Sequence, residues 1–148
     1  MKMKQIMLTS LLTFMFIPSA GAQSSEQYAV MARAVWSAFE CSSLAAESGD
    51  HKEQKRLFMF GYNQGKVFIA AVQAGKVKRK DLSSNAPIGV LVRLEGPSPD
   101  FMLGRIYEGA QDDALNDVYH VGNSDKDNKL AASNKFTTKN CQLIGSGR

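Results

Sequence analysis

The stretch from Asp50 to Gly75, DHKEQKRLFMFGYNQGKVFIAAVQAG, carries the pattern that decides the fold. Asp50 and Glu53 are spaced as in a capping box, in which side chains at a helix start satisfy its free amide groups, and Gly75 is a typical helix end. Apolar side chains nearly encircle the segment between them: Leu57, Phe58, Phe60, Tyr62, Phe68, Ile69 and Val72. Because a helix that is apolar on most sides belongs at the centre of a bundle, the pattern predicts an all-α fold with this helix in the middle.

Two glycines of this segment, Gly61 and Gly65, lie one turn apart on a common face. The missing side chains would let a neighbouring helix approach closely, which is the interpretation we favour. A groove for a ligand or partner is the alternative. The same face could also support a homodimer.

Further helices are predicted on both sides of the central one. Ser24 and Gln27 form a capping-box pattern ahead of a helix that reaches about Glu47, and Ser98-Pro99-Asp100 starts a helix that reaches about Tyr119. The segment Ile88 to Leu94 fits a short helix better than a strand. Residues 76–86 are expected to form a solvated connector and residues 122–128 a loop, followed by a helical turn at 129–132 and an irregular tail anchored by Cys141 and Leu143. The prediction is therefore a small helical bundle of about four to five helices.

Residues 1–22 have the features of a cleaved export signal. Lys2 and Lys4 precede an apolar run from Ile6 to Ile17, and Ala20-Gly21-Ala22 resembles a cleavage site of the bacterial type. Cleavage would leave residues 23–148 as a single helical domain in the periplasm, with no stable membrane span, because no other run approaches the length that a bilayer requires. Removing the two signal lysines lowers the formal net charge from +4 to +2, so a nucleic-acid partner is not expected.

The chain contains two cysteines, Cys41 and Cys141. In an oxidising compartment an even number of cysteines favours a disulfide, and two free buried thiols are the alternative. A bridge would close a loop of about 100 residues and stabilise the fold by roughly 4–5 kcal/mol in the chain-entropy model. The sequence has no C-x-x-C motif, so we expect a structural rather than a redox-catalytic role.

The sequence matches none of the catalytic patterns that we considered, which include H-E-x-x-H, the P-loop, G-x-G-x-x-G and G-x-S-x-G. No cofactor or metal site is predicted, and His51 and His120 are assigned to the surface. The residues Asn123, Asp125 and Asp127 resemble the opening of a calcium loop, but the glycine and the glutamate that such a loop needs are missing. The remaining enzymatic option is chemistry on wall glycans by carboxylates of one helix, and its candidates are Glu108, Asp112 and Asp113, with Asp117 on the same helix.

Two features are candidates for contact with a partner. Lys76, Lys78, Arg79 and Lys80 place four positive charges within five residues, a cluster that suits docking onto an acidic surface. Phe101 follows the rigid turn Pro97-Ser98-Pro99-Asp100, which could hold the ring outward. The plainer alternatives are a solvated loop for the basic cluster and core packing for Phe101.

The combination of an export signal, a helical domain, one cysteine in the first helix, another near the tail and no catalytic set resembles small helical periplasmic proteins that work by binding. In architecture the chain is similar to immunity proteins against type VI secretion effectors and to inhibitors of wall-degrading enzymes. Acid-stress periplasmic chaperones are the second group that it resembles. The first resemblance implies a non-enzymatic protein that binds another protein in the periplasm, such as a toxin or a hydrolase, and the second implies a stress chaperone.

Overall fold

The computed structural model describes residues 23–120 and 122–147, and the elements of this part of the chain are all helical. They are six α-helices and a short 3-10 turn: α1 (Ser25–Ser48), α2 (His51–Gln73), α3 (Arg79–Asn85), α4 (Ile88–Leu91), α5 (Pro99–Leu115), α6 (Asp125–Thr138) and η1 (Cys141–Leu143). The prediction of an all-α fold is confirmed. The expected export signal at residues 1–22 lies outside the described residues. None of the described helices is long and apolar enough to cross a membrane.

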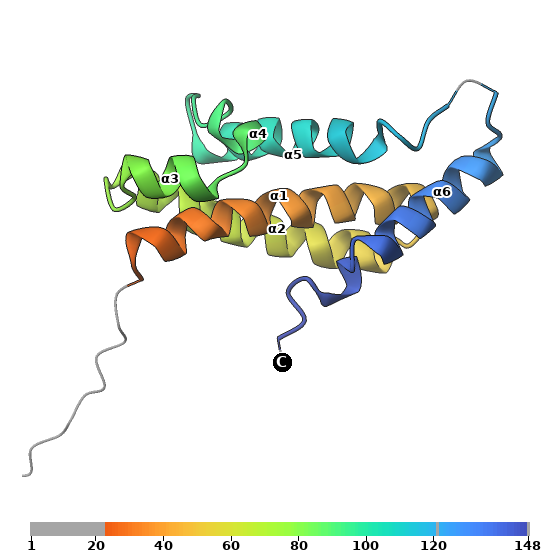
Figure 1. Ribbon diagram of the computed structural model, residues 1–148, viewed down its shortest axis with the longest axis horizontal. Helices are drawn as coiled ribbons and strands as arrows, with labels where there is room; N and C mark the ends of the chain where they lie inside the picture. The colour runs from red at the N-terminus through yellow and green to blue at the C-terminus, as the bar shows by residue number, and fades with distance from the viewer. Residues whose placement is uncertain (1–22, 121, 148) are drawn as a thin grey trace, which may run out of the picture.

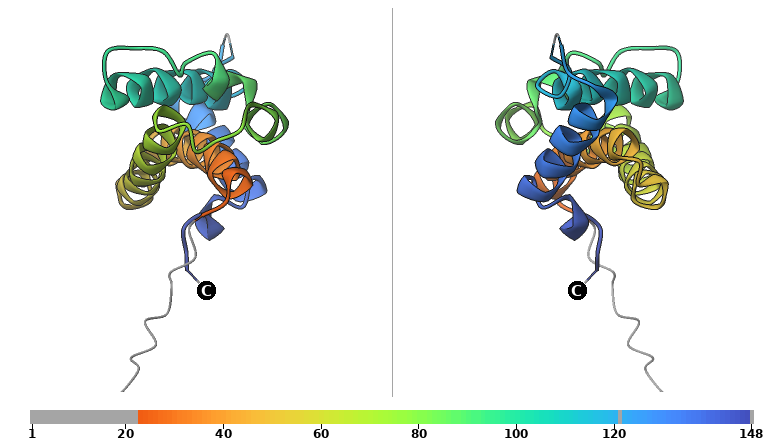
Figure 2. Two further views of the ribbon diagram at one scale, coloured as in Figure 1. Left: turned by 90° about the vertical axis from the view of Figure 1, so that its left-hand side faces the viewer. Right: turned by 90° about the vertical axis from the view of Figure 1, so that its right-hand side faces the viewer.

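The four long helices alternate in direction along the long axis of the molecule (Figure 1). α1 and α2 lie side by side as an antiparallel pair, and α5 lies over this pair and contacts both helices. α6 returns along α1 at the far end of the molecule, while the short helix α3 lies near the start of α1 and α4 lies further along it, beside Trp36 (Figures 1 and 2). Helix α1 therefore contacts every other helix of the bundle.

The central helix is α1, so the prediction that α2 occupies the centre is wrong. The eight consecutive residues from Ala38 to Ala45 are all buried, which means that neighbours cover this part of α1 on every side. Small side chains such as Ala38, Ser42 and Ala45 let several helices approach at once. Several large apolar side chains of α2 remain at the surface instead: Phe58, Met59 and Val67.

The buried side chains form two clusters. The first lies where α1, α2 and α5 meet and is built around Phe39, Phe68 and Leu103. The second surrounds the disulfide, where Leu44, Leu57 and Val118 pack near α6. The inner face of α5 is buried at Leu103, Ile106, Ala110 and Ala114. The helix ends at Leu115 rather than near Tyr119, and Val118 is buried in the turn that follows it.

Gly61 and Gly65 serve close packing within the chain. A Cβ atom on Gly61 would lie 2.8 Å from the ring of Phe39, and one on Gly65 would collide with the side chain of Leu103. The favoured interpretation of this glycine pair is therefore confirmed. The face that could have formed a groove is filled by α1 and α5.

Two segments differ from the expectation and a third agrees with it. The connector at 76–86 contains α3, whose start is tied to α1 because the Ser25 hydroxyl accepts a hydrogen bond from the Lys78 amide and donates one to Asp81. The expected loop at 122–128 contains the start of α6, where Ser124 and Asp127 form a complete capping box. Asp125 and Asp127 thus lie in a helical first turn, which does not have the form of a calcium loop. The segment at 88–94 is helical as favoured, with α4 covering Ile88–Leu91.

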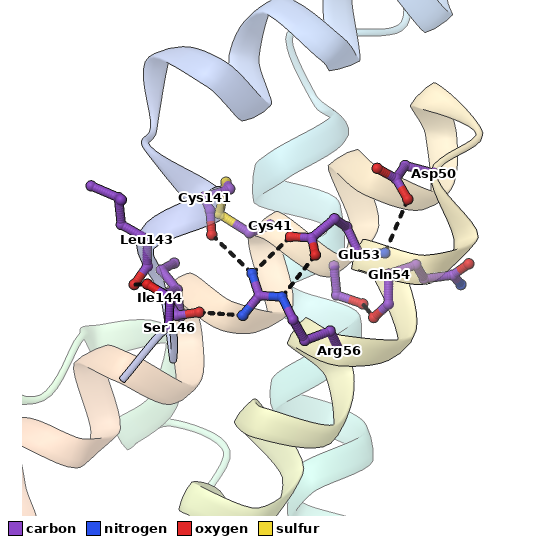
Figure 3. A network of polar contacts seen from close by, with 10 residues as sticks. Cys41, Asp50, Glu53, Gln54, Arg56, Cys141, Leu143, Ile144 and Ser146 are labelled. Carbon is purple, nitrogen blue, oxygen red and sulfur yellow. Dashed lines mark hydrogen bonds and ion pairs between the residues drawn. A yellow bond between two sulfur atoms is a disulfide. The ribbon is translucent and has the colours of Figure 1, made fainter. Parts of the chain in front are cut away.

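The predicted disulfide between Cys41 and Cys141 is present, and both cysteines are buried. It joins the middle of α1 to the chain that follows α6 (Figure 3). Arg56 of α2 reinforces the junction, since its guanidinium donates to the Glu53 carboxylate and to the carbonyl oxygens of Cys141 and Ile144. The expectation that Leu143 anchors the tail is wrong, because this side chain is 53% exposed while Ile144 packs against the second cluster.

Candidate functional site

The predicted basic cluster lies at the junction of α2 and α3. Lys76 is in the turn after α2, Lys78 is the N-cap residue of α3, and Arg79 and Lys80 follow in its first turn. All four side chains are exposed. Positive charge at the start of a helix adds to the positive end of the helix dipole, so this corner of the molecule presents a positive potential.

Phe101 lies in the first turn of α5. The start of α5 and helix α3 lie at the same end of the bundle (Figure 1). Its ring is 49% exposed and packs over Gly96. The guanidinium carbon of Arg105 lies 6.0 Å from the ring centroid, within the range of a cation–π contact. Phe101 is thus a surface residue held in place from two sides, not a member of either core cluster.

The carboxylates proposed for glycan chemistry are only partly brought together. Asp112 and Asp113 line a shallow depression beside Trp36 and Asn116, whereas Glu108 is exposed outside its lining. The face of Trp36 already carries a basic side chain, because the guanidinium carbon of Arg93 lies 6.0 Å from the ring centroid. The fourth carboxylate of this helix region, Asp117, forms an ion pair of 3.3 Å with Lys135 and so ties α6 to the segment after α5.

The two histidines do not contribute to a catalytic arrangement. His51 is exposed in the first turn of α2, where its Nδ1 lies 3.1 Å from the Gln54 side-chain oxygen. His120 is exposed in the segment that follows α5. Both cysteines are consumed by the disulfide, so neither supplies a thiol nucleophile.

Glu40 is a buried carboxylate near the disulfide, with only 6% of its surface exposed. Its Oε1 lies 3.0 Å from the Nζ of Lys139. Burial raises the pKa of Glu40, and the nearby carboxylate of Asp113 adds to this effect while Lys139 opposes it. Since its partner comes from the segment after α6, this carboxylate joins α1 to the tail.

A site that the sequence did not reveal lies between α1, α2 and α5. We call it the aromatic recess, a hollow of about 190 Å³. Its lining is almost entirely apolar, with a single carboxylate: Phe39, Phe58, Tyr62, Asp100, Leu103, Gly104 and Tyr107. It opens at the surface, because 36% of Phe58 is exposed and a Cβ atom on Gly104 would meet nothing within 4 Å.

The rings of the recess hold one another in fixed orientations. Phe58 and Tyr62, one turn apart on α2, are nearly parallel with centroids 6.1 Å apart. Tyr107 of α5 meets Phe58 edge to face at 5.4 Å and Phe39 of α1 at 5.3 Å. Such edge-to-face pairs are favourable arrangements of aromatic rings, so the recess is preformed rather than assembled by a ligand.

One polar contact crosses the rim of the recess. The hydroxyl of Tyr62 donates a hydrogen bond of 2.8 Å to Oδ1 of Asp100, which joins α2 to the first turn of α5. This hydrogen bond to the Asp100 carboxylate stabilises the protonated phenol and so raises the pKa of Tyr62. Asp100 stays at the rim because the fold places it in an exposed first helical turn, after the Ser98 cap and Pro99.

The sequence signal for this site was weak. Phe58 and Tyr62 stand four residues apart, but the pattern around them indicates only two apolar side chains of a buried helix. Nothing in the spacing along one helix indicates that rings from three helices meet at a surface opening.

The recess is suited to binding rather than to acid–base or metal chemistry. Its lining contains one carboxylate and two phenols but no histidine, lysine or thiol. Within the described part of the chain, no group of three or more histidine, cysteine, aspartate or glutamate side chains is placed to hold a metal ion. Comparisons of the chain with models of known protein families, with curated proteins and with solved structures gave no significant match.

Proposed function

We propose that this protein is exported to the periplasm and acts there without catalysis, by binding another protein. The observation that carries the proposal is the aromatic recess, a preformed apolar opening on a disulfide-linked helical scaffold. Aromatic side chains in fixed pockets are typical centres of protein interfaces, and a rigid site loses little conformational entropy on binding. Immunity proteins and inhibitors that occlude a toxin or a wall hydrolase work in this way.

The exposed basic cluster supplies a second contact in this proposal. Lys76, Lys78, Arg79 and Lys80 are solvent-exposed, so their main effect is to attract an acidic partner and to speed the encounter. The recess then supplies the close contacts that hold the complex. Replacing all four with serine is expected to slow association about tenfold at low salt with little effect on dissociation.

The glycan enzyme is the less favoured function, because its carboxylates have little support around them. Asp112 and Asp113 lie in an open depression where water screens them, and Glu108 does not line it. General acid catalysis needs a carboxyl group whose surroundings keep it protonated near neutral pH. The carboxylate of this region with a raised pKa, Glu40, is instead engaged by Lys139.

The decisive experiment is capture of a partner by the purified domain 23–148 from a periplasmic extract of its own source. The wild-type domain is expected to retain one partner in stoichiometric amount. The Gly104→Leu variant should lose it, because the added side chain fills the recess at a position with free space and a better helix former. A matched control, Ser133→Leu, adds the same side chain to an exposed position of α6 and should retain the partner.

Two outcomes would contradict the proposal. One is that neither the wild-type domain nor the control retains a stoichiometric partner. The other is measurable turnover of a wall glycan that disappears on replacing Asp112 or Asp113 with alanine. The second outcome would reassign the function to the depression beside Trp36.

A further inference from the structure

We propose that the aromatic recess receives a basic side chain, lysine or arginine, from the partner protein. This inference rests on the proposed function, since it names the chemical group of the partner that enters the recess. Three observations support it: the aromatic lining of the recess, the carboxylate at its rim, and the cation–π contacts that basic side chains of this chain make with aromatic rings.

The aromatic lining offers attraction to a cation. Phe39, Phe58, Tyr62 and Tyr107 line a space of about 190 Å³, and the ring of Tyr107 is nearly perpendicular to those of Phe39 and Phe58. The faces of such rings are negative, and a cation within about 6 Å of a ring centroid gains roughly 0.5–2 kcal/mol. A site with several rings set at angles to one another can attract a single ammonium or guanidinium group from more than one side.

The only charge in the lining is negative. Asp100 accepts the hydrogen bond of Tyr62 through Oδ1, and the described part of the chain provides no partner for Oδ2. The one charged side chain in the lining is therefore a carboxylate, which complements a basic group.

Three aromatic side chains, one of them the recess residue Tyr62, already carry basic partners from this chain. The Nζ of Lys66 lies 4.8 Å from the centroid of the Tyr62 ring, and guanidinium groups lie over Trp36 and Phe101. Among the described residues, no such contact is found for Phe58 or Tyr107, the rings whose edge-to-face pair forms the recess. Phe58 is 36% exposed and Tyr107 is partly buried, so the recess offers at least one ring to a cation from outside.

A basic side chain fits the recess better than an apolar one. An aliphatic group would fill the volume but would remove water from Asp100 without replacing its hydrogen bonds, which is unfavourable. Lysine and arginine carry an apolar stem that can lie on Phe39 and Leu103 and a charged head that can reach the rim. The small volume suits one side chain rather than the face of a helix.

The test compares charged and neutral probes of equal shape by NMR titration of the full mature domain. Nα-acetyl-lysine amide is compared with Nα-acetyl-norleucine amide, and the corresponding arginine derivative with that of citrulline. The charged probe of each pair is expected to bind at least about fivefold more tightly, and to shift the amide signals of Gly104 and Tyr107. Equal affinity within both pairs would overturn the inference.

Two variants locate the charge effect. Asp100→Asn should reduce the preference for the charged probes by about threefold while leaving the neutral ones unchanged, because the amide keeps the shape of the carboxylate. Gly104→Leu should abolish all binding at the recess, and Ser133→Leu should not alter it. An unchanged preference in Asp100→Asn, or probe binding that survives Gly104→Leu, would contradict the assignment.

Further arms separate this inference from the proposed function. Choline serves as a free quaternary ammonium probe, and binding of choline without binding of the lysine or arginine derivative would overturn a protein side chain as the ligand. If the captured partner is still lost with Gly104→Leu but not with Asp100→Asn, the proposed function stands and the basic side chain is wrong. If the wild-type domain captures no partner, the proposed function is contradicted, whatever the result of the probe titrations.

Discussion

Glu40 shows how a single charged side chain can be kept in the core of this domain. It is the one charged residue among the buried polar side chains that the structure describes. The other two, Ser42 and Ser43, donate their hydroxyls to the carbonyl oxygens of Gln54 and Phe39. Glu40 is compensated by Lys139 alone, so its charged form remains less favourable in the fold than in water.

Replacing Glu40 with glutamine is therefore expected to stabilise the domain at neutral pH. A carboxyl whose pKa is raised by folding contributes stability below its ordinary value of 4.5, and this contribution is lost as the pH rises through the higher pKa of the folded state. The free energy of unfolding of Glu40→Gln, relative to wild type, should thus increase from pH 4 to pH 7 in urea titrations. The matched control Glu108→Gln, at an exposed position, should show little of this change.

The opposite sign would mean that the ion pair with Lys139 outweighs the burial of Glu40. The predicted sign also bears on the stress-chaperone alternative, in which acid loosens the domain. Protonation of Glu40 favours the folded state, so this residue cannot act as the trigger of acid loosening.

Two glycines in neighbouring helices should respond in opposite ways to the same substitution. At Gly65 an added Cβ atom collides with Leu103 and lies 3.5 Å from Val35, so Gly65→Ala is expected to destabilise the domain by about 1–3 kcal/mol. At Gly104 the space is free, so Gly104→Ala should stabilise it by roughly 0.5–1 kcal/mol through helix propensity. Urea unfolding of the pair tests this, and equal effects would contradict the close approach of α2 and α5.

The roles of single residues could be predicted from the sequence where they depend only on residue type and on neighbours along the chain. The pairing of Cys41 and Cys141 follows from a count of two, and the caps at Ser24, Asp50 and Ser98 follow from local chemistry. The aromatic recess could not be found in this way, since it depends on how three helices cross. The polar character of Asp100 and the apolar character of Phe58 carry no information about their proximity.

Among the helices, α1 occupies the central position that hydrophobicity predicts for α2, and α2 is partly exposed. A count of large apolar side chains favours α2 as the centre, but the centre of this bundle is crowded and admits small side chains. α1 supplies these through Ala32, Ala38 and Ser42, while α2 keeps Phe58 and other large side chains partly at the surface. Two of the aromatic side chains of α2, Phe58 and Tyr62, line the recess together with residues of α1 and α5.

Helix α6 differs from the other long helices because it is mostly polar. Ala132 is its one buried residue, and its contacts with the bundle include the hydrogen bond of 2.9 Å from Lys135 to the carbonyl of Ala114. This composition explains why only a helical turn at 129–132 was predicted. The helix forms because Ser124 and Asp127 satisfy its first amide groups and because the disulfide holds the chain that follows it.

Removal of the cap should therefore loosen α6 without affecting the rest of the bundle. Ser124→Ala deletes the hydroxyl that accepts from the Asp127 amide, which is expected to cost about 1 kcal/mol of local helix stability. Hydrogen exchange of the amides from Asp125 to Thr138 should become roughly fivefold faster, while those of α1 stay unchanged. Ser133→Ala, within the same helix, is the control, and an equal effect there would show that the cap is not what limits α6.

For the whole molecule, the all-α class of the fold could be predicted from the sequence, but the arrangement of the helices could not. Helical periodicity and two cysteines establish an all-α bundle with a long-range bridge, because both depend on local pattern and on a count. Which helix is central, and where the surface opens, depend on side-chain shapes in three dimensions. The two clusters built around Phe39 and Leu44 are consequences of that packing.

Loss of the disulfide should unfold the molecule in a defined order. The bridge joins residues 100 positions apart, so its removal in the double variant Cys41→Ser, Cys141→Ser is expected to lower the free energy of unfolding by about 2–5 kcal/mol. α6 and the tail should separate first, because apart from the bridge they are held by few buried side chains and by polar contacts such as those of Arg56. Hydrogen exchange would then show fast amides in α6 while the cluster around Phe39, and with it the aromatic recess, remains protected.

Simultaneous exposure of both clusters would instead mean that the bridge stabilises the bundle as a single cooperative unit, and binding at the recess would then be lost together with α6.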